Sequence, residues 1–392
     1  MPDRKEDGTG MLTIEKHVFW GEIVMRFIKI EELRPGMRLA RPIYSKKGVL
    51  LFERAAAIKD AQSIQSIKSF GLIGLFVLEP AEPVPPMTEQ DLEFERFQTM
   101  MTFEIKDELD TICKTHKTKH IMTIVAAIIK AYGNTKGKIN FQQSLRSRED
   151  YVYKHSLNTA ILCAMIAHSM NCSLAEQQDA VTAAIVHDIG KISIAPEILY
   201  MQNHTPEQQQ AISEAETGAY ELIDEALIAR PNVRRICAQA QKMLSSILRE
   251  ENVTNTKMLS AARILMTAGA FDNETAVRMD HSPMSEIQVV RGMLHKPEFF
   301  DEKVVRAIID SVSMLFPGVS VELNTGEKAL VLSETMDPLR PIILSFTDNS
   351  IINLMDRRSY AELEIVDIMK TMDNRYVIDM TALEKFTASD CS

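Results

Sequence analysis

The stretch from Ala183 to Lys191 carries the residue types that could perform metal chemistry. An apolar run with helical periodicity ends in His187 and Asp188, and Lys191 follows within one turn. An imidazole nitrogen beside a carboxylate suits a divalent transition metal. A bound metal activates water and polarises a phosphoryl group, and a nearby ammonium can hold a phosphate oxygen. The stretch therefore predicts phosphate-ester chemistry, with Asp188 and Lys191 as the catalytic residues.

Two further expectations concern the end of this helix. Gly190 is expected to let the chain leave the helix through a conformation that other residues resist. Lys191 lies four residues after His187, so a continuing helical turn would return its ammonium to the same spot. The alternative interpretation is a helix that ends by chance in a polar cluster, with a histidine that binds nothing.

The same stretch resembles the motif of the HD superfamily of metal-dependent phosphohydrolases. The neighbouring segments resemble the HD-GYP family, whose members hydrolyse the bacterial second messenger cyclic di-GMP. The resemblance covers about residues 26–350 and is strongest over 150–192. Asp150–Ala160 is similar to the helix that brings the family's first metal-binding histidine, which implies that His155 is a ligand. His187 and Asp188 match the next two ligands, and Lys191 matches the residue that contacts phosphate.

Further along the chain the family pattern fails. Glu214 stands where the family has a metal-binding histidine, although Gly218 of the same motif is present. The segment Ile236–Met243 has none of the histidines that the family places there, and its Lys242 would add positive charge to the pocket. No Gly-Tyr-Pro sequence occurs in the chain. Gly269 stands where the family has a metal-binding aspartate. Asp272 matches a second aspartate of the family, which is interpreted as structural.

These departures predict an incomplete metal site. His155, His187 and Asp188 remain as metal ligands, and Glu214 is a fourth candidate. Such a set of ligands predicts that at most one divalent ion binds, such as iron or manganese. A two-metal site, by contrast, holds both the attacking and the leaving oxygen of the phosphodiester. We expect a weakly active or inactive member of cyclic di-GMP signalling that acts as a nucleotide-binding or scaffold module. The alternative is an active one-metal phosphohydrolase that cleaves a cyclic dinucleotide or another phosphoester by a metal-activated water.

The composition argues against some classes of binding partner and some cellular locations. The net charge of −10 argues against nucleic-acid binding. The five cysteines form no CxxC pair, which favours reduced thiols and a cytoplasmic location. No apolar run approaches the roughly 18 residues that a membrane span needs. Cyclic di-GMP and signalling proteins are the expected partners, and a second copy of the chain, forming a homodimer, is a further alternative.

Periodicity predicts a mainly α fold, an all-helical HD-type bundle flanked by a small N-terminal α+β domain and a short C-terminal β subdomain. We expect a flexible extension over 1–25, the α+β domain over 26–80, a proline-rich linker and helix start over 81–98, the helical domain over 99–316, and a β-rich subdomain and tail over 317–392. The α+β domain is expected to serve packing or dimerisation more than sensing. Single strands are predicted over Leu39–Tyr44 and Tyr376–Met380, and a helix over part of 359–372.

Overall fold

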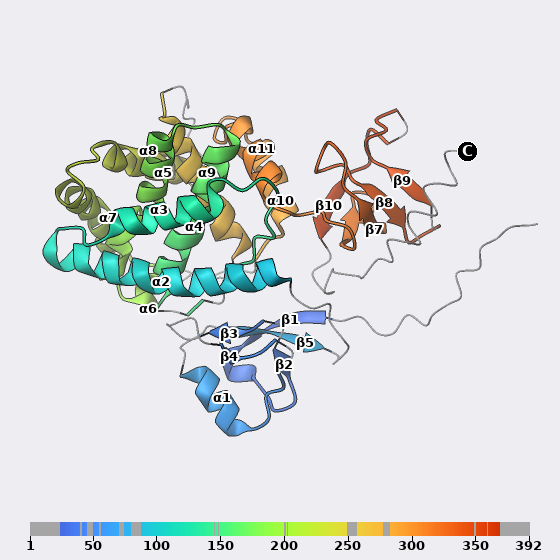
Figure 1. The fold of residues 1–392 in the computed structure, drawn as a ribbon, viewed down its shortest axis with the longest axis horizontal. Helices are drawn as coiled ribbons and strands as arrows, with labels where there is room; N and C mark the ends of the chain where they lie inside the picture. Colours follow the sequence, from blue (N-terminus) through green and yellow to red (C-terminus); the bar gives the residue numbers. More distant parts are fainter. Residues whose placement is uncertain are drawn as a thin grey trace, which may run out of the picture.

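The computed structural model describes residues 24–368, with gaps at 40, 45–49, 55, 70–73, 80–87, 145, 148, 200, 202, 249–256, 277–282, 349 and 359. Most of the expected extension, most of the proline-rich linker and the strand predicted at Tyr376–Met380 therefore lie outside the described residues. Figure 1 shows a helical bundle with a small α+β unit on one side and a β-sheet on another. The predicted mainly α fold is confirmed.

The N-terminal unit, residues 24–79, has its own apolar core. Its elements are β1 (Val24–Lys29), a 3-10 turn (Ile30–Glu32), β2 (Arg38–Leu39), β3 (Ile43–Tyr44), β4 (Leu50–Phe52), α1 (Ala61–Lys68) and β5 (Gly74–Glu79). An antiparallel sheet has the order β1-β5-β2, and β3 and β4 form a separate pair. Ile58, Ile67 and Val77 are buried in this core.

The strand predicted as Leu39–Tyr44 is wrong, because the structure divides it into β2 and β3, which belong to different sheets. Pro42 lies between the two. Proline has no N–H group to donate to a strand ladder, so pairing stops there. The break leaves Arg41 at the turn between the two sheets.

The helical bundle follows from α2 to α11. Its elements are α2 (Glu89–Thr115), α3 (Ile121–Tyr132), α4 (Tyr151–Ser169), α5 (Leu174–Val186), a 3-10 turn (Ile189–Ser193), α6 (Pro196–Leu199), α7 (Pro206–Ala226), α8 (Asn232–Leu248), α9 (Ser260–Thr275), α10 (Glu286–Leu294) and α11 (Glu302–Ser311). Capping boxes at Ser173 and Thr205 begin α5 and α7.

Helix α4 lies at the centre of the bundle and packs against α5, α9, α11 and α2. Residues 155–167 of this helix are all buried. A helix that is surrounded by others needs no polar face, so its sequence is apolar nearly all round. A polar side chain on α4 therefore faces a neighbouring helix rather than solvent, and His155 is such a side chain.

The C-terminal sheet has the order β10-β6-β7-β8-β9 and is antiparallel. Its strands are β6 (Ser320–Leu323), β7 (Lys328–Ser333), β8 (Ile342–Ser345), β9 (Ile351–Asn353) and β10 (Ile365–Ile368). The helix predicted within 359–372 is wrong at 365–368, where β10 pairs with β6. Ile365 is fully buried in that pair, and such non-local packing outweighs a local helical pattern. Val321 and Ile365 belong to the same apolar core as the bundle.

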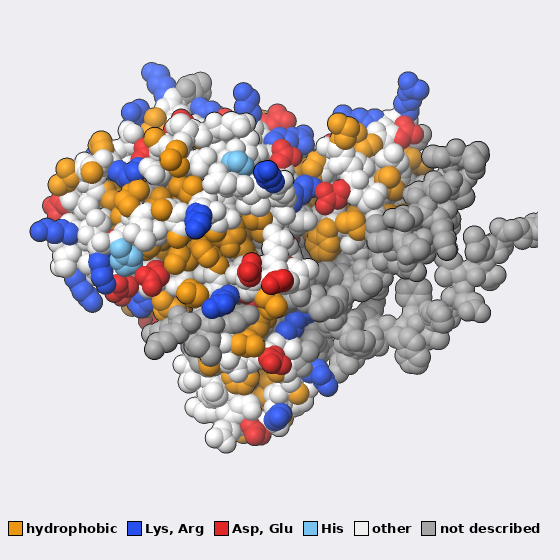
Figure 2. Space-filling model, in the orientation of Figure 1, with side chains coloured by type: hydrophobic (Ala, Val, Ile, Leu, Met, Phe, Trp, Pro, Cys, Tyr) orange, Lys and Arg blue, Asp and Glu red, His pale blue; other side chains and the backbone are white. Residues whose placement is uncertain are grey.

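The surface carries several exposed apolar side chains. Leu92 and Met100 on α2 and Met122 on α3 are exposed. Figure 2 shows hydrophobic side chains gathered over the part of this face where α2 and α3 lie. In the described part of the chain, no helix combines the length and the apolar character that crossing a membrane requires.

Candidate metal centre

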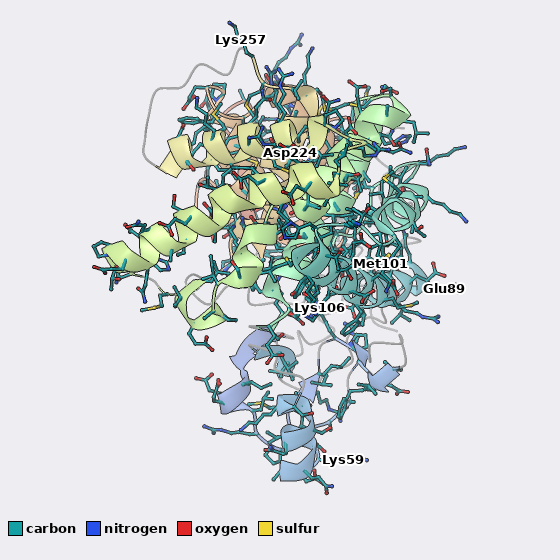
Figure 3. All side chains as sticks on the ribbon, turned by 90° about the vertical axis from the view of Figure 1, so that its left-hand side faces the viewer. Lys59, Glu89, Met101, Lys106, Asp224 and Lys257 are labelled. Carbon is teal, nitrogen blue, oxygen red and sulfur yellow. The ribbon has the colours of Figure 1, made fainter. Side chains whose placement is uncertain are left out.

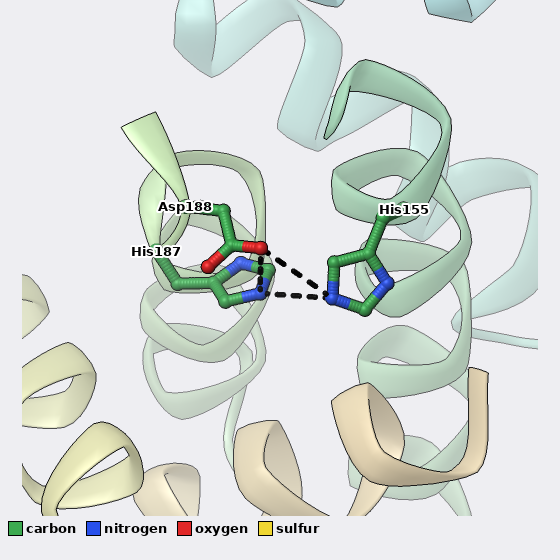
Figure 4. A group of neighbouring side chains, drawn as sticks. All are labelled: His155, His187 and Asp188. Carbon is green, nitrogen blue, oxygen red and sulfur yellow. Dashed lines mark hydrogen bonds and ion pairs between the residues drawn. The ribbon is translucent and has the colours of Figure 1, made fainter. Parts of the chain in front are cut away.

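Three donor atoms from α4 and from the end of α5 converge at one point. The Nε2 atoms of His155 and His187 lie 3.3 Å apart. Oδ2 of Asp188 lies 3.8 Å from the first of these nitrogens and 3.7 Å from the second. Figure 4 shows the His187 ring and the Asp188 carboxylate side by side, with the His155 ring opposite them. The described residues contain one group of three His, Cys, Asp or Glu donors this close together, and it is this one.

The outer nitrogen of each imidazole fixes its tautomer. Nδ1 of His155 lies 2.6 Å from Oδ2 of Asp272, and Nδ1 of His187 lies 2.8 Å from the carbonyl oxygen of Ala184. Both partners can only accept, so each Nδ1 carries the proton and donates it. In the neutral rings both Nε2 atoms then present lone pairs toward the shared point. This is the arrangement in which imidazoles bind a metal.

Asp272 is held in place by a buried network. Nη2 of Arg146 lies 2.7 Å from both carboxylate oxygens of Asp272, and Nδ2 of Asn158 donates to Oδ1 at 2.9 Å. Burial raises the pKa of Asp272, but the Arg146 guanidinium and the hydrogen bond from His155 lower it further, so the pKa lies well below its ordinary value. The carboxylate therefore stays ionised and orients His155, a function that its interpretation as merely structural did not include.

Burial and neighbouring charges also set the protonation of the other donors. Burial lowers the pKa of His187 to about 4, against the opposing effect of Asp188. Burial raises the pKa of Asp188, but the Lys191 ammonium and the two imidazoles outweigh it and hold that pKa well below its ordinary value. At neutral pH the centre thus offers a neutral His187 and an anionic Asp188. Those are the protonation states that metal ligands require.

Lys191 reaches Asp188 by a route that differs from the predicted one. Helix α5 ends at Val186, and a 3-10 turn covers Ile189–Ser193. Nζ of Lys191 lies 2.8 Å from the Asp188 carboxylate, three residues back. Lys191 thus lies beside the Asp188 carboxylate, whereas the prediction placed its ammonium over His187 by a continuing helical turn.

Gly190 serves a different purpose from the one expected. Among the described glycines, positive φ values occur at Gly36, Gly318 and Gly326, and Gly190 is not one of them. Instead, a Cβ at position 190 would lie 2.4 Å from the carbonyl oxygen of Ala215 on α7. The glycine therefore allows the backbones of the turn and α7 to approach closely, and the expected special backbone conformation is wrong.

A small cavity of about 30 Å³ adjoins the three donors. Its lining also includes Lys191, Ala240, Gly269 and the amide side chains of Gln241 and Asn273, together with apolar side chains from α8 and α9 (Cys237, Leu244, Leu265 and Met266). A volume of this size holds an ion with one or two small ligands, because a single water needs at least roughly 10–15 Å³. It is far below the roughly 300–1,000 Å³ of pockets that enclose a drug-sized molecule.

The structure does not bring every predicted side chain to the centre. Glu214 is exposed, accepts a hydrogen bond from Gln210 at 2.8 Å, and lies outside the donor group. Lys242 is also exposed and is not part of the cavity lining, so the charge expected from it falls elsewhere. Gln241, its neighbour, lines the cavity instead.

Glu216, which was not among the predicted site residues, is the carboxylate of α7 that faces this region. Burial raises its pKa, while Lys191 lowers it and Asp188 raises it. Gln241 donates a hydrogen bond to Glu216 at 3.3 Å. Residues 214 and 216 lie about 200° apart around a helix, so only one of them can face inward. The partial periodicity of α7 would have favoured Glu216, but the family alignment directed attention to Glu214.

The residues present fit a single metal ion. Two nitrogen donors about 2.1 Å from one ion at a tetrahedral angle lie about 3.4 Å apart, close to the 3.3 Å between the two Nε2 atoms. Two imidazoles and one carboxylate suit zinc, iron or manganese. His155 and His187 are both backed by acceptors, as metal-binding histidines usually are.

Comparison with known proteins agrees with this chemistry. Residues 152–274 match the family model described as HD domain, a span that contains the three donors and Asp272. This segment is an HD domain. HD domains are metal-dependent, and His155, His187 and Asp188 form a group that could hold a metal ion.

The chain is also similar to two known proteins. The chain is 22% identical over 192 residues to cyclic di-GMP phosphodiesterase PA4108 of Pseudomonas aeruginosa, a match that covers 48% of this chain and 46% of that protein. The chain thus matches less than half the length of this relative. A likeness to Bd1817, a HDG"Y"P protein from Bdellovibrio bacteriovorus, has a TM-score of 0.42 at 11% identity and covers 72% of this chain and 97% of that one. At this TM-score the likeness carries no argument about the site.

Proposed function

We propose that the HD domain binds one divalent metal ion, iron, manganese or a similar metal, through His155, His187 and Asp188, and that the chain acts in cyclic di-GMP signalling with weak or no hydrolytic turnover. One observation carries the proposal. Three donor atoms lie close together beside a cavity of about 30 Å³. Among the described residues this is the one group of three possible metal donors. Two histidines and one aspartate suffice for one ion and are too few for a bridged pair.

The cavity wall explains why turnover should be weak. Gly269 and Ala240 line it with no donor side chain. Gln241 and Asn273 add only uncharged amides, and the amide nitrogen of Gln241 is hydrogen-bonded to Glu216. A second ion would leave much of its charge uncompensated, because Asp188 is the one carboxylate among the described lining residues. When bound, a single metal would activate water and polarise a phosphoryl group. Lys191, the one cation among the described residues of the lining, would attract a phosphate oxygen.

The proposal of cyclic di-GMP as the ligand is supported by the name of the Pseudomonas relative and by the anion-attracting Lys191. A cyclic dinucleotide is much larger than the cavity, so it would bind across the mouth with one phosphate directed inward. Turnover with one ion is a second candidate function. The intact contacts from Asp272 to His155 and from Lys191 to Asp188 favour it.

Metal content tests the proposal first. The chain would be purified from cells supplied with iron and manganese, and the metal measured by elemental analysis. We expect about one ion per chain, and none in His187→Ala. His168→Ala is the matched control, because His168 lies near the other end of α4 and outside the donor group. Two ions per chain in the unsubstituted protein, or none, would overturn the proposed centre.

Ligand binding and turnover are measured on the same metal-loaded preparation. Isothermal titration with cyclic di-GMP should show binding that weakens in Lys191→Met. Release of linear dinucleotide should be slow or absent. No binding at high micromolar nucleotide would reject the ligand and leave a scaffold that is recognised by a partner protein or by a second copy. Turnover at the rate of an intact HD-GYP phosphodiesterase would reject weak activity and establish the second candidate.

A further inference from the structure

Arg41 connects the N-terminal unit to the helical bundle. It lies at the turn between β2 and β3, and its side chain is 15% exposed. Nη1 of Arg41 donates to the carbonyl oxygen of Gln143, and its Nε lies 4.0 Å from Oε1 of Glu95 on α2. Figures 1 and 3 both place the N-terminal unit at one side of the bundle, next to α2. The guanidinium therefore joins two parts of the chain that have separate apolar cores.

Arg41 contacts a buried segment whose backbone belongs to no helix or strand and so lacks a regular series of hydrogen bonds. Residues 140–144 lie between α3 and α4 in neither helix nor strand. Gln142 and Gln143 are nevertheless buried, and their carbonyls need donors from elsewhere. Gln98 on α2 donates to the carbonyl of Gln142 at 3.2 Å, and Arg41 donates to that of Gln143. These two side chains hold the segment from outside, because it has no regular structure to hold itself.

The side chain of Gln143 continues the connection to the metal centre. Its Oε1 accepts from Nη2 of Arg146 at 2.9 Å and from Nδ2 of Asn158 at 3.1 Å. The same two groups donate to Asp272 at 2.7 Å and 2.9 Å. Asp272 in turn orients His155 through the 2.6 Å contact with Nδ1. The backbone carbonyl of Gln143 is thus held by Arg41. Its side-chain oxygen accepts from Arg146 and Asn158, the same two groups that donate to Asp272.

We propose that Arg41 is a positioning residue through which the N-terminal unit sets the metal affinity of the HD domain. Moving Arg41 would shift Gln143, redistribute the donors that hold Asp272, and turn the imidazole of His155 away from its partner donors. A change in the N-terminal unit, by a ligand or by association with another chain, would then reach the metal without any direct contact. The inference rests on the proposed metal centre and adds an input to it.

The test measures Mn²⁺ affinity by isothermal titration on the full chain. Arg41→Met keeps a long side chain and removes the guanidinium. We expect its metal binding to be about threefold to tenfold weaker, less than the roughly 10–100-fold that the loss of a direct partner costs. Arg34→Met is the matched control, because Arg34 is an exposed arginine of the same unit, and it should leave the affinity unchanged. Arg41→Lys, which keeps the charge but not the planar fork, gives a second measurement if Arg41→Met fails to fold.

A double-mutant cycle tests the route itself. In Asp272→Asn the carboxylate that receives the connection is lost, so adding Arg41→Met should weaken metal binding little further. Fully additive effects would reject the route through Asp272. An unchanged affinity in folded Arg41→Met and Arg41→Lys would reject the inference while leaving the metal centre intact. A protein with no Mn²⁺ binding at all would instead overturn the metal centre, a result that is distinct from either.

Discussion

Restoring a carboxylate at position 269 is the sharpest perturbation of the centre. Gly269 lies on α9 and lines the cavity beside His155 and His187. A Cβ built there meets only Cγ2 of Thr159 at 3.9 Å, which is ordinary van der Waals contact. The backbone therefore accepts Gly269→Asp without displacement, and the carboxylate enters the space next to the donors.

Three contributions to the free energy of Gly269→Asp can be compared: helix propensity, burial of the carboxylate and its attraction to the metal ion. A glycine replaced within a helix gains about 0.3 kcal/mol of propensity when the new residue is aspartate. Burying an unpaired carboxylate costs several kcal/mol, so the metal-free variant should be less stable than the parent. A divalent ion about 4 Å away attracts that carboxylate by roughly 8 kcal/mol at an effective dielectric constant of about 20. The attraction exceeds the desolvation cost, so metal affinity should rise by at least about tenfold, or ~1.4 kcal/mol.

The assay compares Gly269→Asp with Gly269→Asn, which has the same shape without the charge. Thermal unfolding is followed in EDTA and in excess Mn²⁺, and the dissociation constant is measured by titration. The aspartate variant should melt lower than the asparagine variant in EDTA and show the larger rise on adding metal. Equal metal responses in the two variants would mean that side chains at position 269 do not reach the centre, and the reasoning from the cavity lining would be refuted.

Two further predictions concern stability. With the pKa of His187 lowered to about 4, the unfolded chain binds a proton between roughly pH 6.5 and 4 that the folded chain does not. In metal-free protein this residue should therefore remove about 3 kcal/mol of the free energy of unfolding as the pH falls through that window. Urea unfolding at pH 7 and 4.5 should show a smaller drop in His187→Gln, and an equal drop would contradict the assignment. Gly190, in the turn that contacts α7, and Gly218, within α7, should respond oppositely to alanine. Gly190→Ala places a Cβ 2.4 Å from the Ala215 carbonyl oxygen and should cost about 1–3 kcal/mol, whereas Gly218→Ala meets nothing within 4 Å and should gain about 0.5–1 kcal/mol. Equal stability of these two variants would show that α7 does not pack on the turn as described.

Local sequence determined much of this protein. The capping boxes at Ser173 and Thr205 set the starts of α5 and α7, because a cap is formed by residues three positions apart. The adjacent pair His187 and Asp188, with Lys191 one turn later, indicated metal and phosphate chemistry without any knowledge of the fold. The turn between β2 and β3 also has a local cause in Pro42, although the sequence analysis overlooked it.

Tertiary structure decided which side chains belong to the centre. His155 and Asp272 are 117 positions apart in the chain, and only the packing of α4 on α9 brings them to 2.6 Å. The orientation of α7 placed Glu216 near Lys191 and left Glu214 in solvent; the periodicity of the helix favours that orientation, but only the packing shows which group Glu216 meets. The connection from Arg41 through Gln143 depends on a loop without regular structure. Such positions follow from non-local hydrogen bonds in the folded chain, which no residue spacing encodes.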